Sequence, residues 1–128
     1  MKRILVAEDR PASLELIRTV LESAGYEVID AMDGQDALHK AGTNSVDLVL
    51  LDLQMPGMNG LEVLRALRDR NLLARIIMVT LHDSPEIRAE CRQGGTDGFV
   101  AKSDLAHDLP KEIARIFNNN SGDHNSRG

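Results

Sequence analysis

The chain has no tryptophan and only three other aromatic residues, Tyr26, Phe99 and Phe117, so its core must be built from aliphatic side chains. The single cysteine, Cys91, excludes an internal disulfide and a zinc site of four thiolates, and it fits a reducing compartment. No apolar run approaches the roughly 18 residues that span a bilayer. Acidic residues at positions 8 and 9 also come too early for a secretory signal. These absences predict a cytoplasmic protein that does not enter a membrane.

Positive charge is also in short supply. The 128 residues include 15 Lys and Arg against 20 Asp and Glu, which gives a formal net charge of −5. This balance argues against a nucleic-acid surface on the chain itself, although a partner domain could still bind DNA. The length predicts one domain with a sizeable core.

Five short apolar runs alternate with helical patterns along the chain. The runs cover residues 3–7, 27–29, 46–51, 75–80 and 98–101. The first, third and fourth are nearly continuous and rich in β-branched residues, which is typical of strands that are covered on both faces. Five strands alternating with five helices predict an α/β fold with a parallel sheet, and right-handed crossovers then place helices on both of its faces.

Local signals mark several helix ends. Pro11 suits a first helical turn, Asp33 precedes a shorter helix, and the segment 83–85 opens a helix that closes at 94–95. The helix from 85 has the weakest apolar stripe, which makes it a candidate for movement. Residues 118–128 contain no aliphatic side chain. We therefore expect a domain of residues 1–117 followed by a disordered tail or the start of a linker.

Polar side chains collect where the predicted strands end. Glu8 and Asp9 follow the first strand, Asp52 ends the third, Thr80 ends the fourth and Lys102 follows the fifth. The carboxyl ends of parallel strands are where ligands bind in such sheets. If these four strands lie side by side, the five groups share one cleft.

Three neighbouring carboxylates repel one another unless a hard divalent cation joins them. A carboxylate can also attack a phosphoryl group, with a lysine ammonium and a threonine hydroxyl available for the phosphoryl oxygens. Taken singly, each residue has a structural explanation: Asp52 as a turn residue, Glu8 and Asp9 as acids at a helix start, Lys102 as a surface lysine. Their coincidence at one edge favours metal-assisted phosphoryl transfer.

These residues resemble the receiver domain of two-component response regulators. The match rests on Glu8-Asp9, on the nine-residue motif from Asp52 to Gly60 (DLQMPGMNG), on Thr80, and on the run GGTDGFVAK that ends at Lys102. It extends over residues 2–117. The resemblance implies a flavodoxin-like, doubly wound fold, with a five-stranded parallel sheet in the order 2-1-3-4-5 and five helices on both faces.

The resemblance also implies roles in chemistry. Asp52 would accept a phosphoryl group from a histidine kinase or a phosphotransfer protein. Magnesium would be bound by Asp9 and Asp52 directly, by Glu8 through water, and by the backbone carbonyl of Gln54. Lys102 would pair with the phosphoryl group. The chain would catalyse only its own phosphorylation and dephosphorylation, so it would not be an enzyme toward external substrates.

Further implied roles concern the response to phosphorylation. Thr80 would move to bond the phosphoryl group, and Phe99 would change rotamer with it. The helix from 85, the strand 98–101 and the last helix would then report the change to an output domain or protein. A phosphorylated second copy of the chain is a further candidate partner.

Several positions depart from the usual receiver pattern. Ser103 follows Lys102 where many receivers have a proline, so we expect either a trans or a strained bond there. Leu81 is larger than the residue commonly found after Thr80, and it is predicted to narrow the approach to Asp52. Gln54 and His82 would tune the lifetime of the acyl phosphate, although His82 could equally be an ordinary loop residue. Phe99, which replaces a commoner tyrosine, could likewise be only a core residue.

With Ser103 after Lys102 and Leu81 after Thr80, the chain resembles receivers that precede helix-turn-helix output domains of the LuxR type. In that case residues 118–128 would be a truncated linker. Three other functions would fit parts of this pattern. A dehalogenase-type phosphatase needs a second aspartate where this chain has Gln54. A flavin protein needs a phosphate loop after the first strand, where the acidic pair would repel a phosphate. A binding module that keeps the fold without phosphorylation stays open, because Leu81 and Ser103 are unusual.

Overall fold

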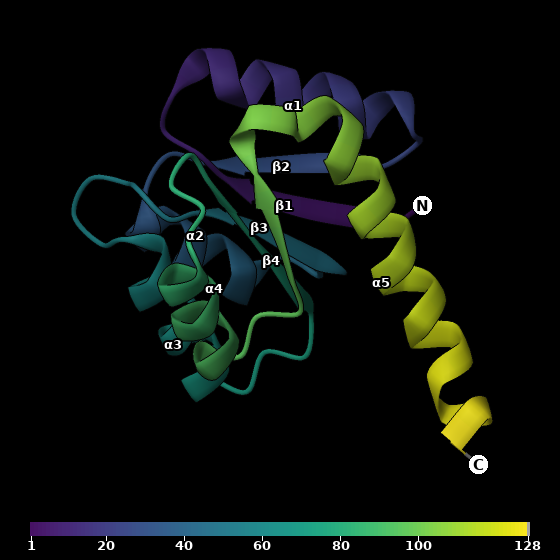
Figure 1. Cartoon of the computed structure of the whole chain (residues 1–128). Coiled ribbons are helices and arrows are strands. Elements are labelled where there is room, and N and C mark those ends of the chain that lie inside the picture. Colours follow the sequence, from purple (N-terminus) through teal and green to yellow (C-terminus); the bar gives the residue numbers. More distant parts are fainter. Residues whose placement is uncertain (128) are drawn as a thin grey trace.

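The computed structural model describes residues 1–127, with side chains as far as Asn118. Five parallel strands form one sheet in the order β2-β1-β3-β4-β5 (Figure 1). The predicted fold class and strand order are therefore confirmed. The strands are β1 (Arg3–Ala7), β2 (Glu27–Ala31), β3 (Leu48–Asp52), β4 (Arg75–Thr80) and β5 (Gly98–Ala101).

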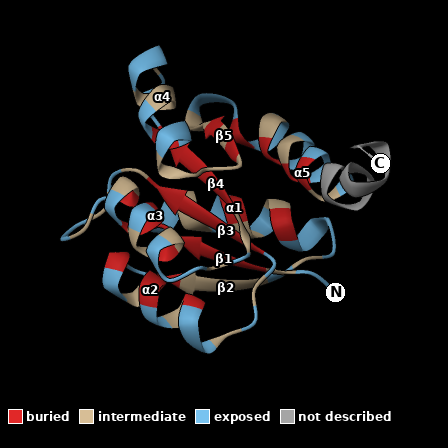
Figure 2. Ribbon diagram, turned by 90° about the horizontal axis from the view of Figure 1, so that it is seen from below, coloured by how far each residue is buried: buried red, intermediate tan, exposed pale blue. Residues whose placement is uncertain are grey.

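Burial along the strands follows their place in the sheet. All five residues of β3 are buried, as are nearly all of β1 and β4, whereas the edge strand β2 begins exposed. Figure 2 shows this concentration of buried residues in the middle of the sheet. Strand β2 extends two residues beyond the predicted 27–29, because Ala31 pairs with Ala7 of β1. Strand β3 begins at Leu48, two residues later than predicted, and ends on Asp52.

Helices cover both faces of the sheet, as Figures 1 and 2 show. One core packs α2, α3 and α4 against one face, and a second core packs α1 and α5 against the other. Both cores are almost entirely aliphatic, as the scarcity of aromatic residues requires. The helices are α1 (Pro11–Ser23), α2 (Gly34–Thr43), α3 (Gly60–Asp69), α4 (Pro85–Gly94) and α5 (Leu105–Arg127).

The helices begin where local sequence chemistry favours a start. Pro11 occupies the first turn of α1. The side chain of Asp33 accepts a hydrogen bond from the Asp36 N–H at 2.8 Å, and that of Ser84 caps α4 in the same way. Helix α4 buries only one residue, Cys91, which agrees with its weak apolar stripe.

The start of α3 is pressed against the end of β3. A Cβ atom at Gly60 would collide with the backbone carbonyl of Asp52, so the close approach requires glycine. The Gly60 N–H also donates to the Leu53 carbonyl at 2.9 Å. Asn59 and Glu62 close a capping box at the same place. These contacts fix the backbone that carries Asp52.

The C-terminal helix is longer than expected. Helix α5 runs through Arg127, whereas a disordered tail or linker was predicted from residue 118. The side chains of residues 119–127 and the whole of residue 128 lie outside the described part, so the boundary between domain and linker stays a prediction. Among the described residues, none of the helices has the length and apolarity needed to cross a membrane.

Candidate functional site

The strand order brings the predicted site residues to one edge of the sheet. Strands β1, β3, β4 and β5 are consecutive neighbours, and in their register Asp52 lies beside Val79 and Thr80 beside Ala101. Each strand ends at the same edge because all are parallel. The four strand ends thereby bring five side chains together: Glu8, Asp9, Asp52, Thr80 and Lys102.

Lys102 bridges two buried carboxylates. Its ammonium nitrogen lies 2.6 Å from Oε1 of Glu8 and 3.1 Å from Oδ2 of Asp52. The three side chains are only 7%, 1% and 5% exposed, respectively. Burial raises the pKa of Glu8, and the hydrogen bond from Lys102 opposes that rise. The lysine therefore points at the site although a serine follows it.

Backbone groups orient the remaining carboxylate oxygens. The Arg10 N–H donates to Oε2 of Glu8 at 3.1 Å, and the Gln54 N–H donates to Oδ1 of Asp52 at 3.2 Å. Both bonds come from the residue two positions after the acid they hold. The carboxylates of Glu8 and Asp52 are thus fixed from two sides, by the chain that follows each of them and by Lys102.

Asp9 completes the acidic group, and one of its oxygens has no partner in the described residues. One oxygen from each of Glu8, Asp9 and Asp52 lies within 4.8 Å of the other two. Oδ1 of Asp9 is buried and has no hydrogen-bond partner within the described part of the chain. The one ammonium group thus pairs with two of the three carboxylates, and a buried acceptor on the third is left without a donor in the described residues. Hard divalent cations take this kind of donor set, so these side chains fit a magnesium-like ion.

A pocket of about 780 Å³ opens beside the acidic group. Asp9, Thr80 and the exposed side chains of Gln54 and His82 are among its lining residues, together with apolar residues of α3, α4 and the loop before α3. Leu81 does not line it, and its side chain is 52% exposed. The predicted narrowing by Leu81 therefore has no support from this pocket and stays a prediction.

Thr80 and Lys102 sit in ordered backbone. Thr80 is buried, and its hydroxyl oxygen accepts a hydrogen bond from the His82 N–H at 3.0 Å. Lys102 begins a short 3-10 helix, Lys102–Asp104, which leads into α5. The Lys102–Ser103 peptide bond is trans, as are all others in the described residues. Of the two alternatives expected for this bond, the structure has the trans form.

Phe99 lies apart from the acidic group, on the surface between α4 and α5. Its ring is half-buried, and the guanidinium of Arg88 stacks over it with Cζ 4.4 Å from the ring centroid. Its N–H donates to Oε2 of Glu112 at 3.1 Å. Arg88 and Glu112 are not predictable from the sequence, because nothing local distinguishes them from other charged residues on helix surfaces.

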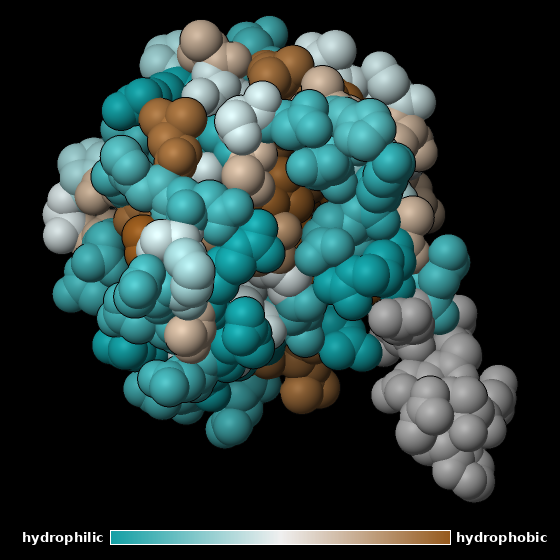
Figure 3. Space-filling view, viewed as in Figure 1, coloured by the Kyte–Doolittle hydropathy of each residue, from teal (hydrophilic) through white to brown (hydrophobic). Residues whose placement is uncertain are grey.

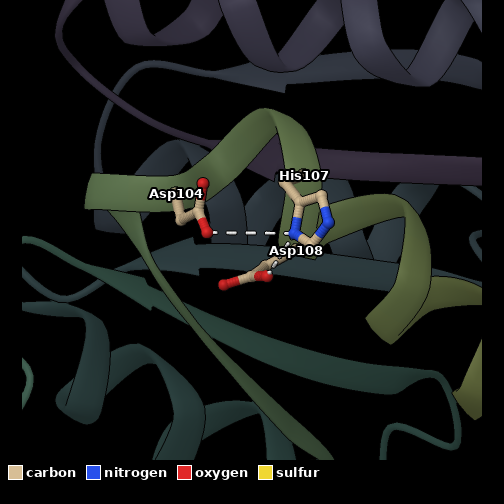
Figure 4. A group of neighbouring side chains, drawn as sticks. All are labelled: Asp104, His107 and Asp108. Atoms are coloured by element: carbon tan, nitrogen blue, oxygen red, sulfur yellow. Dashed lines mark hydrogen bonds and ion pairs between the residues drawn. The ribbon is translucent and has the colours of Figure 1, made fainter.

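A second group of metal-ligating types lies at the start of α5 (Figure 4). Nδ1 of His107 is 3.1 Å from a carboxylate oxygen of Asp108 and 3.8 Å from one of Asp104. The three side chains are 46–65% exposed and pair with one another. Acidic residues are favoured at a helix start in any case, so these contacts account for the group.

Comparison with known proteins identifies the family. Residues 4–114 match the model of the response regulator receiver domain. The alkaline phosphatase synthesis transcriptional regulatory protein PhoP of Bacillus subtilis is 38% identical over 116 residues, which are 91% of this chain and 48% of PhoP. The polar-differentiation response regulator DivK of Brucella anthropi is 35% identical over 79% of this chain and 84% of DivK. The chain belongs to the response regulator receiver domains of two-component systems.

Solved structures agree with this assignment. The response regulator TrrA of Thermotoga maritima, in complex with Mg(2+)-BeF, is 36% identical and superimposes with a TM-score of 0.82 over 91% of this chain and 99% of TrrA. A LuxR-family response regulator from Aurantimonas sp. SI85-9A1 is 31% identical, with a TM-score of 0.84 over 89% of this chain and 83% of that one. A LuxR-type neighbour is thus present among the similar structures. The chain spans about half of PhoP's length, so PhoP carries sequence that this chain does not match.

Proposed function

We propose that this receiver domain is a phosphoacceptor switch in which Asp52 takes a phosphoryl group from a histidine kinase or a phosphotransfer protein. The observation that carries the proposal is the imbalance at the sheet edge. Of three carboxylates within 4.8 Å of one another, two share the one ammonium group, and a buried oxygen of the third, Asp9, has no partner in the described residues. A purely structural cluster would have its buried acceptors satisfied.

The bonds that form and break in the chemical step belong to Asp52 and the phosphoryl donor. A carboxylate oxygen of Asp52 attacks phosphorus, and the bond from phosphorus to the donor's nitrogen or oxygen breaks with its electrons going to the donor. The product is an acyl phosphate on Asp52. Hydrogen bonds from the Gln54 N–H and from Lys102 hold the two oxygens of the nucleophile in place before the attack.

Magnesium is the proposed cofactor. Glu8, Asp9, Asp52 and the backbone carbonyl of Gln54 would hold Mg²⁺, which when bound supplies positive charge beside the phosphoryl oxygens. The unpartnered oxygen of Asp9 supports this assignment, as does the similar TrrA structure, which is a complex with Mg(2+)-BeF. Filling the acidic group with a divalent cation would remove the repulsion among its carboxylates.

Phosphorylation would change the charges that the neighbouring side chains meet. The phosphoryl group adds about 1.5 to 2 negative charges at Asp52. Lys102, already within 3.1 Å of Asp52, would pair with the new oxygens. The Thr80 hydroxyl, whose oxygen accepts from the His82 N–H, would move to donate its own hydrogen to them. Phosphorylation can shift the equilibrium between two conformations of the domain only by the difference in their interaction energies with the phosphoryl group.

The readout would be the surface formed by α4, β5 and α5, where Phe99 responds to Thr80. An output domain or a separate output protein would contact this surface. A transcriptional output, as in the name of PhoP, is one form of it, and a phosphorylated second copy of the chain is another candidate partner. Gln54 and His82, which line the pocket beside Asp9, would tune the lifetime of the acyl phosphate.

Intact-mass spectrometry tests the proposal. The full chain is incubated with acetyl phosphate or phosphoramidate, with and without Mg²⁺, and the Asp52→Ala variant is treated in parallel. We expect a gain of one phosphoryl mass that needs both Mg²⁺ and Asp52. If neither donor labels the wild type or Leu81→Ala, the chain instead fits the alternative of a receiver-fold module that signals without phosphorylation.

A further inference from the structure

Arg88 joins the loop after β4 to strand β5. Its guanidinium donates twice to the carboxylate of Asp83, at 2.6 and 2.9 Å, and stacks over the ring of Phe99 at 4.4 Å. The N–H donors of a guanidinium lie in its plane, and its flat face can stack on an aromatic ring. Arg88 can therefore make both contacts at once. We call these three side chains the Arg88 clasp. Arg88 lies one turn into α4, and the clasp folds back over the loop that precedes this helix.

The clasp holds a segment that borders the functional site. Residues 80–84 run from the end of β4 to the cap of α4, and Thr80 and His82 line the pocket beside Asp9. The His82 N–H donates to the Thr80 hydroxyl oxygen, and Asp83 follows directly. Ser84 then caps the helix through the Ile87 N–H at 3.1 Å. Hydrogen bonds therefore fix the segment at three points: at Thr80, at Asp83 and at Ser84.

The other side of the clasp is anchored on α5. The Phe99 N–H donates to Glu112, and two guanidinium nitrogens of Arg115 bind the same carboxylate at 2.9 and 3.0 Å. Arg88 and Glu112 also attract one another, which contributes to the raised pKa of Arg88, whose first cause is the hydrogen bond to Asp83. Figure 3 shows the largely hydrophilic surface over α4 and α5 and the hollow between them, a cavity of about 510 Å³ lined by the clasp residues and Glu112.

We propose that Arg88 is a positioning residue for Thr80: it holds residues 80–84 against β5 in the unphosphorylated chain, and this hold opposes binding of a phosphoryl group at Asp52. In the proposed function Thr80 moves to donate its hydroxyl hydrogen to a phosphoryl oxygen, and because its oxygen accepts from the His82 N–H, that movement requires residues 80–82 to shift together. The shift has to strain or break the contacts of Asp83 with Arg88. This inference rests on the proposed function.

Arg88→Gln tests the proposal in the full chain. The affinity for beryllofluoride in the presence of Mg²⁺, a stand-in for the phosphoryl group, is measured by titration calorimetry. Loss of a partly exposed contact between a cation and a ring predicts binding that is about two- to fivefold tighter. Arg92→Gln is the matched control, because Arg92 lies on the same helix and has no ring contact or ion pair in the described residues. We expect its affinity to equal that of the wild type.

Two more variants separate positioning from folding. In a Phe99→Leu background, Arg88→Gln should have a smaller effect on affinity than in the wild type, because the ring is gone. Arg88→Lys keeps the positive charge but not the two-pronged bond, so its affinity should be intermediate. Melting temperatures are measured alongside. A merely structural role would lower them without tightening the binding of beryllofluoride.

The outcomes are distinguishable. Tighter binding in Arg88→Gln that depends on Phe99 supports the clasp. Binding that equals the Arg92→Gln control, or that becomes weaker, overturns it while the proposed function stands. A wild type that binds no beryllofluoride and takes no phosphoryl group overturns the proposed function and the clasp together.

Discussion

Two clusters of charged residues lie at opposite ends of the sheet, and they are built differently. At the amino ends of the strands, Asp97 has both oxygens paired, one with Arg75 at 3.3 Å and the other with Arg68 and the Ile76 N–H, each at 2.8 Å. Arg68 further donates to three backbone carbonyls. At the carboxyl ends, Lys102 is shared by two carboxylates, and an oxygen of Asp9 has no partner in the described residues.

The difference separates a structural cluster from a functional one. Every carboxylate oxygen of the first cluster is satisfied, so an added ion would gain little there. The second cluster holds more negative charge than the surrounding protein neutralises. Repulsion among its carboxylates lowers the stability of the folded state, so stability does not explain why these residues are together. The unsatisfied end is therefore the end at which we expect a cation and a phosphoryl group to bind.

The largest effect is expected from breaking the satisfied cluster. Arg68→Ala leaves Asp97 and three carbonyls short of donors, so the free energy of unfolding should fall by about 2–4 kcal/mol. Urea unfolding measures this change. Arg65→Ala, one turn earlier on the same helix and exposed, should change it by less than about 0.5 kcal/mol. Equal losses in the two variants would contradict the structural importance of the cluster.

The next effect concerns the backbone beneath the functional cluster. In Gly60→Ala, a Cβ atom collides with the Asp52 carbonyl, and overpacking of this kind costs about 1–3 kcal/mol. Thermal unfolding should show a clear loss of stability. Gly42→Ala, in α2 with open space around the added methyl group, should instead raise stability by about 0.5–1 kcal/mol. A silent Gly60→Ala would mean that α3 does not need its close approach to Asp52.

A smaller effect of opposite sign is expected at the unsatisfied cluster. Asp9→Asn removes one of three mutually repelling carboxylates, so the metal-free chain should become more stable by about 1 kcal/mol. Differential scanning calorimetry in a chelating buffer measures it. Destabilisation comparable to that in Arg68→Ala would show that the two clusters are alike after all.

The smallest effect tests access to the functional cluster. If Leu81 narrows the approach to Asp52, Leu81→Ala should be labelled by acetyl phosphate about threefold faster, a barrier change of about 0.6 kcal/mol. The time course of intact mass gives the rate. Because the side chain is half-exposed and does not line the pocket, equal rates would remove it from the mechanism.

Local sequence patterns were enough to predict most of the strands and helices. They also predicted which side chains gather at the carboxyl ends of the strands. The continuous apolar runs predicted β1, β3 and β4, and short-range signals such as Asp33 and Ser84 placed helix starts. Gathering acidic side chains at the strand ends needed only the rule that parallel strands end together. The strand order came from the family resemblance, because periodicity alone does not say which strands are neighbours.

The rest depends on contacts between distant parts of the chain. Arg68 meets Asp97 across 29 residues of sequence, and Arg88 meets Phe99 from a different element. Neither pairing leaves a local pattern, since a surface arginine on an amphipathic helix needs no partner. The two added residues of β2 follow likewise from pairing with β1 and not from hydrophobicity.

The most direct test of the central claim is the effect of Mg²⁺ on thermal unfolding of the wild type and of Asp9→Asn. A ligand that binds only the folded state stabilises it by RT ln(1 + [L]/Kd). The melting temperature of the wild type should therefore rise steadily with the Mg²⁺ concentration, and that of Asp9→Asn should stay nearly constant. A wild type that Mg²⁺ does not stabilise, or two variants that it stabilises equally, would contradict the claim that the unsatisfied cluster is a cation site.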